Sequence, residues 1–525
     1  MDLVLLYFLI LFLSSLLLLL LVRRTGPTGT SSNHCPYPNP ILGNLIPFLR
    51  NRHRFLDWAA SLLSLSPTAT IEVLGPFSLS HGVATANPSI VNHFLISNFH
   101  NYVKGSRIHS ALSDLLGNGL FIADGDLWFL QRKIASREFT TRSLRTFSAD
   151  VFQSHIHDRL LPVLSAAAAS GEIVDLQDVL KRFAFDNICT ISFGHDPGCL
   201  SLDRNRQQHK LFFDAFDDSI EISFNRLLSP IPFLWVVMKY FNVGSERRLK
   251  EAINTINEFA TEIIKSKDLL QGSQKQDLLS RFMAATKEED SGYYNFGTMF
   301  EDPKEKQRFL RDVIVSFVLA GKDSTSSGLT WFFWLLSTNP NVETKIYEEI
   351  SSINENFDYE ELKGLNYLHA AITESLRLYP PVPINSRVVK NNDILPDGTH
   401  VRAGWFADYS AYAMGRDQRM WGPDAEAFLP QRWLDDKGQF VPADPCKFSA
   451  FHAGPRACLG REMAYVQMKA VVAAVLRMFH LEPAGDKNIV PAYEMAVTLR
   501  MKGGLPVHVK KREKTTVTGE LRVEV

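Results

Sequence analysis

The stretch Phe451-His452-Ala453-Gly454-Pro455-Arg456-Ala457-Cys458-Leu459-Gly460 decides how this chain is interpreted. It has the pattern F-x-x-G-x-R-x-C-x-G, and the residues after Gly460 have the spacing of an amphipathic helix. A cysteine directly before a helix lies at the positive end of the helix dipole, which favours its thiolate form. Glycines on both sides let the backbone turn tightly around the sulfur. The pattern therefore predicts a presented thiolate.

We expect Cys458 to be the axial ligand of a haem iron, because a cysteinate pushes electron density onto iron and favours O–O cleavage. The alternative is a core cysteine, which is the common state of a lone Cys. Four partners at fixed offsets favour the ligand: Phe451, Gly454, Arg456 and Gly460.

The composition is that of an ordinary globular protein. The 525 residues are 45% hydrophobic and 22% charged, with a net charge of −1. Basic residues are neither in excess nor massed in one run, so nothing indicates nucleic acid. Five cysteines are few, scattered and odd in number, which favours reduced thiols over a disulfide framework.

The N-terminus predicts a membrane anchor. Residues 3–22 form an almost unbroken apolar run without charge, long enough for one spanning helix. Asp2 precedes the run and Arg23-Arg24 follow it, which predicts a lumenal N-terminus and a cytosolic body. The alternative is a cleaved secretory signal. We expect an uncleaved single-pass anchor at 1–24 in the endoplasmic reticulum, a Pro/Gly-rich linker at 25–50 and the main domain at 51–525.

The rest of the chain predicts a mainly helical body with a minor β region. Helical spacing of apolar residues dominates 89–283, 307–336 and 343–379. A strand is expected at 70–74 and a small hairpin at 394–406. Polar or Pro-containing loops are expected at 201–208, 228–233 and 287–306.

On the motif around Cys458, the chain resembles the cytochrome P-450 family of haem-thiolate monooxygenases. The resemblance implies the P-450 fold, haem b, and electrons from NADPH delivered by NADPH–cytochrome P-450 reductase. It also implies a lipophilic substrate and the endoplasmic reticulum membrane. The resemblance extends from about residue 30 to 512.

Glu374-x-x-Arg377 places two opposite charges on one helix face. Such a pair is common on soluble helices, but here it precedes Cys458 and resembles the family's buried pair. The resemblance adds Arg432 as a third partner, since a buried pair needs further hydrogen bonds. The expected role is structural support of the cysteine loop.

Trp128-x-x-x-Arg132 resembles the family's pattern on the helix beside the haem. An indole N–H and a guanidinium can both donate to a haem propionate, and Arg456 is a second guanidinium partner. The alternative is a surface Arg beside a core Trp.

Ala320-Gly321-Lys322-Asp323-Ser324-Thr325 resembles the family's oxygen-activation motif, A-G-x-[DE]-T-[TS]. Asp323 and Ser324 are the expected catalytic pair, because a carboxylic acid beside a hydroxyl can relay protons. The family's usual Thr is Ser324 here, so the methyl group that restricts rotation is lost. We therefore expect a working relay that loses some oxygen as peroxide. The alternative is an ordinary buried polar turn.

Several phrases resemble the plant branch of fatty-acid ω-hydroxylases, among them Phe193-Gly194-His195-Asp196-Pro197-Gly198-Cys199-Leu200. The resemblance implies hydroxylation of the terminal or near-terminal carbon of an aliphatic chain, with a fatty acid as the leading substrate. The branch also hydroxylates jasmonoyl-isoleucine and sterol side chains, and these stay open. Another class, a reductase-independent haem-thiolate isomerase or dehydratase, fits the Asp323/Ser324 pair less well.

Family position also implies a substrate pocket and a reductase face. Plain core packing is the alternative for each pocket residue, and a mixed-charge surface is the alternative for the face. The implied pocket residues are Leu116, Phe121, Val313, Phe317, Val382 and Met495. The implied basic face on the cysteine side comprises Lys133, Arg137, Lys447, Arg461 and Lys469.

Overall fold

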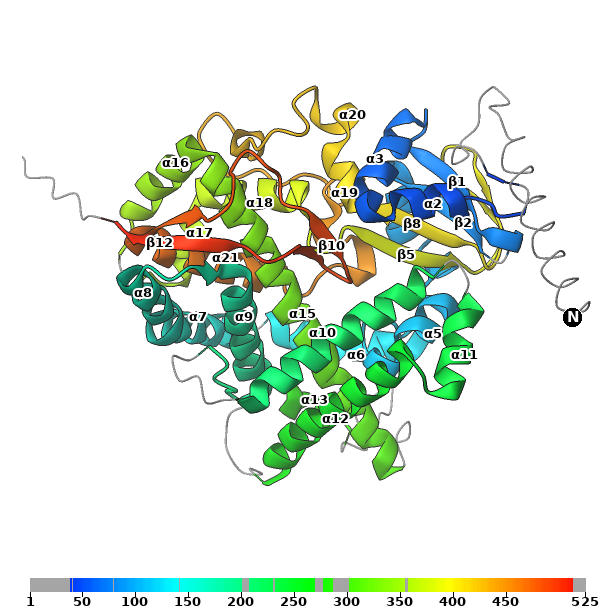
Figure 1. The fold of residues 1–525 in the computed structure, drawn as a ribbon, viewed down its shortest axis with the longest axis horizontal. Helices are drawn as coiled ribbons and strands as arrows, with labels where there is room; N and C mark the ends of the chain where they lie inside the picture. The colour runs from blue at the N-terminus through cyan, green and yellow to red at the C-terminus, as the bar shows by residue number, and fades with distance from the viewer. Residues whose placement is uncertain are drawn as a thin grey trace, which may run out of the picture.

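The computed structural model describes residues 38–512, apart from 40, 79, 141, 201–206, 230–231, 270–276, 287–301 and 355–356. Helices make up most of these residues, and strands are confined to small sheets (Figure 1). The prediction of a mainly helical protein with a minor β region is confirmed.

The helices are α2 (Leu45–Asn51), α3 (Phe55–Leu65), α4 (Pro88–Asn92), α5 (Gly105–Leu116), α6 (Gly125–Thr140), α7 (Arg142–His155), α8 (Leu161–Ser170), α9 (Leu176–Phe193), α10 (Gln207–Leu227), α11 (Pro232–Phe241), α12 (Ser245–Leu269), α13 (Leu278–Ala285), α15 (Pro303–Thr338), α16 (Pro340–Ser351), α17 (Tyr359–Gly364), α18 (Asn366–Leu378), α19 (Ala411–Arg416), α20 (Gln418–Trp421) and α21 (Arg461–Met478).

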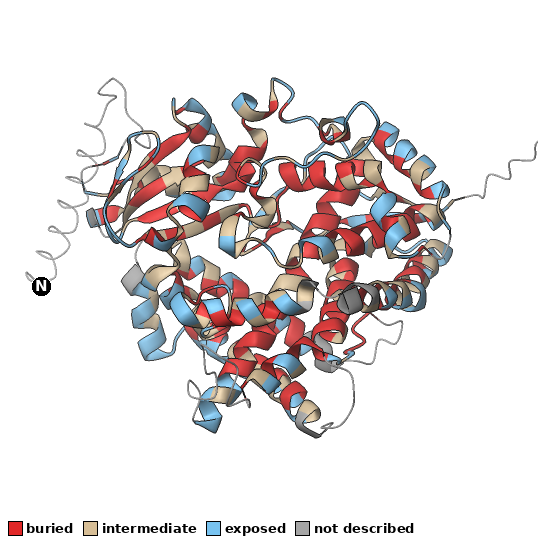
Figure 2. Cartoon of the chain, turned by 180° about the vertical axis from the view of Figure 1, so that it is seen from behind, coloured by how far each residue is buried: buried red, intermediate tan, exposed pale blue. Residues whose placement is uncertain are grey.

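Helix α15 is the axis of the helical body. It begins at an N-cap, where the Asp302 carboxylate accepts from the Lys304 amide at 2.9 Å, and Pro303 occupies the first turn. Nearly every residue from Phe309 to Leu336 is buried, which requires packing on all sides. Helices α9, α12, α13, α18 and α21 supply that packing. Figure 2 shows the buried residues gathered in this interior.

The largest sheet has five strands in the order β1-β2-β8-β5-β3, and only the β2–β8 pair is parallel. It lies beside the helical body, next to α3 and α5 (Figure 1). The bounds of its strands are β1 (Thr70–Leu74), β2 (His81–Thr85), β3 (Tyr102–Val103), β5 (Ile384–Val389) and β8 (Phe406–Ser410). The smaller sheets contain β4 (Val174–Asp175), β12 (Pro506–Lys511) and β9 (Phe479–Pro483); β10 (Tyr493–Met495) and β11 (Leu499–Met501); and β6 (Asp393–Ile394) and β7 (His400–Val401).

The strand predicted at 70–74 is confirmed as β1. The hairpin predicted at 394–406 is shorter, since β6 pairs with β7 and Phe406 begins β8 in the large sheet. The helix expected at 343–379 is divided into α16, α17 and α18. A capping box between Asp358 and Glu361 begins α17, so the middle of that stretch forms a separate helix.

The predicted long helix at 307–336 extends further at both ends as α15. Of the predicted loops, residues 201–206, 230–231 and 287–301 lie outside the described residues. Gln207 already belongs to α10, Pro232 to α11 and Pro303 to α15.

The predicted anchor, residues 1–24, lies outside the described residues, and so does most of the predicted linker. In the part of the chain that is described, no helix combines the length and the apolar character needed to cross a bilayer. The anchor therefore stays a prediction.

Candidate active site

The cysteine loop is formed by two short turns that lead into α21. The Cys458 amide donates to the Phe451 carbonyl at 2.8 Å, and the Ala457 amide donates to the Gly454 carbonyl at 3.0 Å. Gly454 has φ +65°, and a Cβ there would lie 2.1 Å from the Leu95 carbonyl oxygen, so only glycine fits. Cys458 lies deep in the protein, and its exposed surface faces a cavity of about 400 Å³ that it lines. The loop therefore presents the sulfur to the cavity.

Burial raises the pKa of the Cys458 thiol, whereas the Gly460 amide and the guanidinium groups of Arg132 and Arg461 lower it. The burial effect is the larger, so the helix start alone does not secure the thiolate as the sequence suggested. A bound metal ion deprotonates a coordinating thiol outright. The thiolate form of Cys458 would therefore depend on a metal ion bound to the sulfur.

A cluster of four basic side chains, the haem-side cluster, lines the cavity around His452 of the cysteine loop: Lys104, Arg132, Arg387 and Arg456. Its carboxylate neighbour among the described residues is Asp124. Nη2 of Arg456 donates to Asp124 Oδ1 at 2.8 Å. The amides of Lys104 and Gly105 donate to the same carboxylate at 3.0 and 2.9 Å. The positive charge of the cluster exceeds the negative charge beside it.

Two of the predicted propionate partners pack against each other, since the Arg456 guanidinium lies 4.4 Å from the centre of the Trp128 ring. Nη2 of Arg132 donates to the Ala457 carbonyl, which ties α6 to the cysteine loop. All three residues line the cavity.

Arg387 belongs to the same cluster and was not predicted. It is 0% exposed, and Nη1 donates to the Ser386 carbonyl at 2.9 Å. Its Nε and Nη2, together with Nε of Arg456, have no hydrogen-bond partner among the described residues. Burial lowers the pKa of Arg456 to about 10, and nearby Arg387 adds to the effect. Buried unpaired donors carrying excess charge fit an anionic group with several acceptor oxygens, such as the propionates of a haem.

The sequence feature that could have identified Arg387 as a site residue is its position in β5. Burial alternates along this strand, and Asn385, Arg387 and Val389 occupy the buried positions. A charged residue at the buried phase of an alternating strand needs a partner.

Glu374 holds the predicted three-residue ion cluster together. Its two carboxylate oxygens accept from Nε and Nη2 of Arg377, both at 2.7 Å. Arg432 Nε lies 3.2 Å from Oε1. The indole of Trp433 donates to Oε2 at 2.8 Å, and the Leu429 amide donates to Oε1 at 3.0 Å. Glu374 and Arg377 are therefore buried with their hydrogen-bonding capacity used.

On the opposite wall, α15 brings Ser324 to the cavity. Its Oγ donates to the Ala320 carbonyl at 2.6 Å, so the hydroxyl is turned back onto its own helix. Thr325 also lines the cavity. A Cβ at Gly321 would lie 2.4 Å from Ile188 of α9, so this glycine also permits close packing of α9 on α15. The helix is continuous across the motif.

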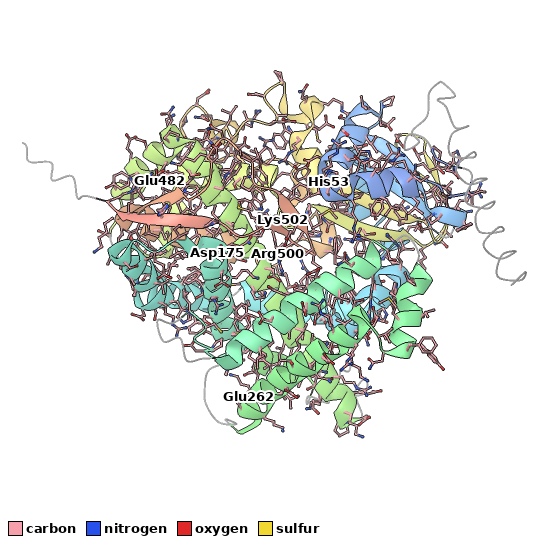
Figure 3. All side chains as sticks on the ribbon, viewed as in Figure 1. His53, Asp175, Glu262, Glu482, Arg500 and Lys502 are labelled. Carbon is pink, nitrogen blue, oxygen red and sulfur yellow. The ribbon has the colours of Figure 1, made fainter. Side chains whose placement is uncertain are left out.

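Asp323 does not line the cavity. It is 2% exposed, and Oδ1 accepts from Lys322 Nζ at 2.8 Å, whereas Oδ2 has no hydrogen-bond partner among the described residues. Lys322 also donates to Asp217 of α10 at 2.9 Å. Arg500 of β11, labelled near the middle of Figure 3, donates to Asp217 at 3.0 Å and lies 3.5 Å from Asp323. Lys181 of α9 pairs with Asp217 as well. The α15 acid thus belongs to a network behind the cavity wall.

Five of the six predicted pocket residues line the cavity, and Phe451 does too. Val313 does not, since it is 1% exposed in the core between α15 and its neighbours. The five are Leu116, Phe121, Phe317, Val382 and Met495.

Lys469 is misplaced in the predicted basic face. It is 2% exposed, and Nζ donates to the Leu362 carbonyl at 2.8 Å, at the C-terminal end of α17. A buried ammonium at a helix C-terminus is stabilised by the helix dipole. Lys133, Arg137 and Arg461 are exposed, and Lys447 is half-buried.

Comparison with known proteins places these features in a family context. The "Cytochrome P450" family model matches residues 34–506. The chain is 44% identical to cytochrome P450 CYP94D108 of Paris polyphylla over 93% of this chain and 94% of that protein. It is 42% identical to cytochrome P450 94A2 of Vicia sativa over 93% of both chains. It is 43% identical to cytochrome P450 94B1 of Arabidopsis thaliana over 92% of both chains.

Proposed function

Because the chain belongs to the cytochrome P450 family of haem-thiolate monooxygenases, we propose that it hydroxylates the terminal or near-terminal carbon of a lipophilic aliphatic chain, with a fatty acid as substrate. The observation that carries this proposal is the cavity above Cys458. Its walls are mostly apolar and come from α5, α9, α10, α15 and β10. Such a cavity can restrain a flexible chain and hold its end carbon near the reacting centre.

In this proposal Cys458 and the haem-side cluster would hold haem b, and Trp128 and Phe451, which line the same cavity, would help to bind it. Haem supplies the activation of O2, which amino-acid side chains do not provide. Arg387 and Arg456 offer the unpaired N–H donors for the propionates. Glu374, Arg377 and Arg432 keep the cysteine loop in place.

Ser324 is the group that holds a transferable proton at the cavity wall. Its Oγ has to leave the Ala320 carbonyl to reach a substrate or a water molecule in the cavity. Asp323 would first take up a proton from Lys322, which donates to its carboxylate behind the wall, and would then reprotonate Ser324. The proton therefore passes from the network to the cavity by way of Ser324.

The electrons come from NADPH by way of NADPH–cytochrome P-450 reductase, in the endoplasmic reticulum membrane. The exposed Lys133, Arg137 and Arg461 support docking of an acidic reductase surface on the cysteine side.

The test is turnover in microsomes that contain the full chain and a plant reductase. Laurate, oleate, jasmonoyl-isoleucine and a 22-hydroxysterol are supplied separately, with Cys458→Ala as the inactive control. We expect NADPH-dependent products hydroxylated at or next to the end carbon of the fatty acids. Oxidation of only the 22-hydroxysterol or only jasmonoyl-isoleucine would reject a fatty acid as the substrate. Conversion of a lipid hydroperoxide without NADPH would reject the monooxygenase reaction itself.

A further inference from the structure

Arg107 is a cavity-lining cation that stands apart from the haem-side cluster. The charges that act on Lys104, His452 and Arg456 come from members of the cluster and from Asp124. Arg107 instead faces Asp408, the one carboxyl group among the described residues that line the cavity. The cavity therefore has a second polar site, formed by Arg107 and Asp408 and separate from the haem-side cluster.

Two direct contacts, and a hydrogen bond between its neighbours, hold the Arg107 side chain in position. Nη1 donates to Ser386 Oγ at 3.1 Å, and Ser386 Oγ in turn donates to Asp408 Oδ1 at 2.5 Å. The guanidinium also lies 4.7 Å from the centre of the Phe406 ring. Ser386 and Asp408 are directly paired across β5 and β8, so the sheet fixes both of them.

These contacts leave the guanidinium with spare donors. Nη1 of Arg107 is 3.9 Å from Asp408, which is beyond hydrogen-bond length, because Ser386 lies between the two groups. Among the described residues, no hydrogen bond is formed by its Nε or Nη2. Burial also raises the pKa of Asp408, which weakens that carboxylate as a competitor for Arg107.

An apolar strip on one face of α5 begins next to Arg107. Ile108, Leu112 and Leu116 of α5 line the cavity at a spacing of four residues, which places them on one face. Eight residues of α-helix span about 12 Å, roughly the length of a medium aliphatic chain. At its far end, Gly119 packs on Ser316 of α15. An aliphatic substrate lying along this strip would have its polar end at Arg107 and its apolar end beside α15.

We propose that Arg107 binds the carboxylate of the substrate, with Ser386 and Asp408 positioning its guanidinium, so that an anionic end group selects the substrate class. This proposal rests on the proposed function. Anchoring the carboxylate restrains the chain from its far end, which is how a cavity favours oxidation at the other end. Arg107 Nε and Nη2 can bind a carboxylate by two parallel hydrogen bonds.

The test compares laurate with methyl laurate, which has the same chain without the negative charge. Binding is measured on the haem-loaded full chain from the change in haem absorbance, for wild type, Arg107→Gln, Arg107→Lys and Arg247→Gln. Arg247 is an exposed arginine of α12 and serves as the matched control. An unchanged haem–thiolate spectrum shows that each variant is folded.

We expect Arg107→Gln to weaken laurate binding at least about tenfold and methyl laurate binding less than about twofold. Arg107→Lys should retain much of the laurate affinity, and Arg247→Gln should match wild type. Equal losses for both ligands, or no loss for laurate, would overturn the anchor. If wild type hydroxylates laurate terminally in either of those cases, the proposed function stands and only the anchor is lost. If wild type binds the ester as well as the acid, the anchor is likewise rejected.

Discussion

Two buried arginines, ten residues apart in the chain, are used in opposite ways. Arg377 on α18 is 2% exposed and Arg387 on β5 is 0% exposed. Arg377 donates to Glu374 and to the carbonyl groups of Gly415, Ala425 and Ala427. Arg387 has one hydrogen bond, to a backbone carbonyl, and two unpaired nitrogens within the described part of the chain.

The difference separates a structural ion pair from a ligand-binding group. A fully paired guanidinium is stable by itself, whereas an unpaired buried guanidinium costs several kcal/mol. The cost at Arg387 is therefore expected to be offset by an anion that binds in the cavity. We infer that the Glu374 cluster holds α18 against residues 415–433 and that the haem-side cluster binds the haem carboxylates.

The largest expected effect comes from breaking the paired side. Glu374→Gln removes the charge that neutralises Arg377 and Arg432, and we expect the free energy of unfolding to fall by about 3–5 kcal/mol. Denaturant unfolding of the haem-loaded protein measures this. The control is Glu360→Gln, since Glu360 is exposed and lies 4.0 Å from Lys363. A loss no larger than that of the control would contradict a structural role for the cluster.

The next prediction compares the two arginines directly. Arg377→Met should lower the free energy of unfolding by about 3–5 kcal/mol, because it leaves Glu374 buried and unpaired. Arg387→Met should leave the haem-free protein as stable as wild type or slightly more stable, because it removes an unpaired charge. It should also weaken haem binding at least about tenfold, since a charge-assisted hydrogen bond contributes about 1.5–3 kcal/mol. Titration with haem and denaturant unfolding check both statements. The reverse order of effects would refute the distinction.

A smaller effect is expected at the opposite wall. Ser324→Thr restores a methyl group that restricts rotation of the hydroxyl, so less NADPH should be lost as peroxide. We expect the ratio of product to peroxide to rise about twofold, a difference of about 0.4 kcal/mol. Peroxide and product are measured per NADPH consumed, and Ser324→Ala is the variant without a hydroxyl. If Ser324→Thr and Ser324→Ala gave equal ratios of product to peroxide, the Ser324 hydroxyl would take no part in the proton relay.

A pH-dependent effect is expected at His369, whose ring is stacked on Tyr465 and tilted against Phe440. Burial and the charges of Lys469 and Arg461 lower its pKa to about 3. Below pH 6.5, the ordinary pKa of His, the unfolded chain therefore gains a proton that the folded chain does not. The free energy of unfolding should fall with acid by up to about 1.4 kcal/mol per pH unit from this residue, down to about pH 3.

His369→Phe should flatten that slope between pH 6.5 and 5, as measured by denaturant unfolding at several pH values. The exposed His53 (Figure 3) is the control, and His53→Phe should retain the wild-type slope. An unchanged slope for His369→Phe would show that the ring is not kept neutral by its surroundings.

The residues that sequence reasoning found are those within short motifs. Cys458, Trp128 with Arg132, and Glu374 with Arg377 are defined by spacings of a few residues. Two short turns form the loop that presents Cys458, and local helix geometry brings each of the two pairs together. Arg387 was missed because its partners come from other segments. Its burial depends on the phase of β5 within a five-stranded sheet, which no local pattern fixes.

The direction in which the Asp323 side chain points could not be predicted from the sequence either. Neighbouring residues of a helix point about 100° apart, so Ser324 lines the cavity while Asp323 faces Lys322, Asp217 and Arg500. Likewise, Lys469 has an ordinary surface sequence, yet it is buried because α17 ends above it.

The most direct test of the account compares haem with its dimethyl ester, in which the propionate charges are removed. Both are titrated into the haem-free full chain, and binding is followed by the absorbance of the thiolate complex, in wild type and in Arg387→Met. The account predicts that wild type prefers haem by at least about a hundredfold and that Arg387→Met loses at least about tenfold of this preference. Equal affinity of wild type for haem and the ester would contradict the claim that the haem-side cluster is built for the haem carboxylates.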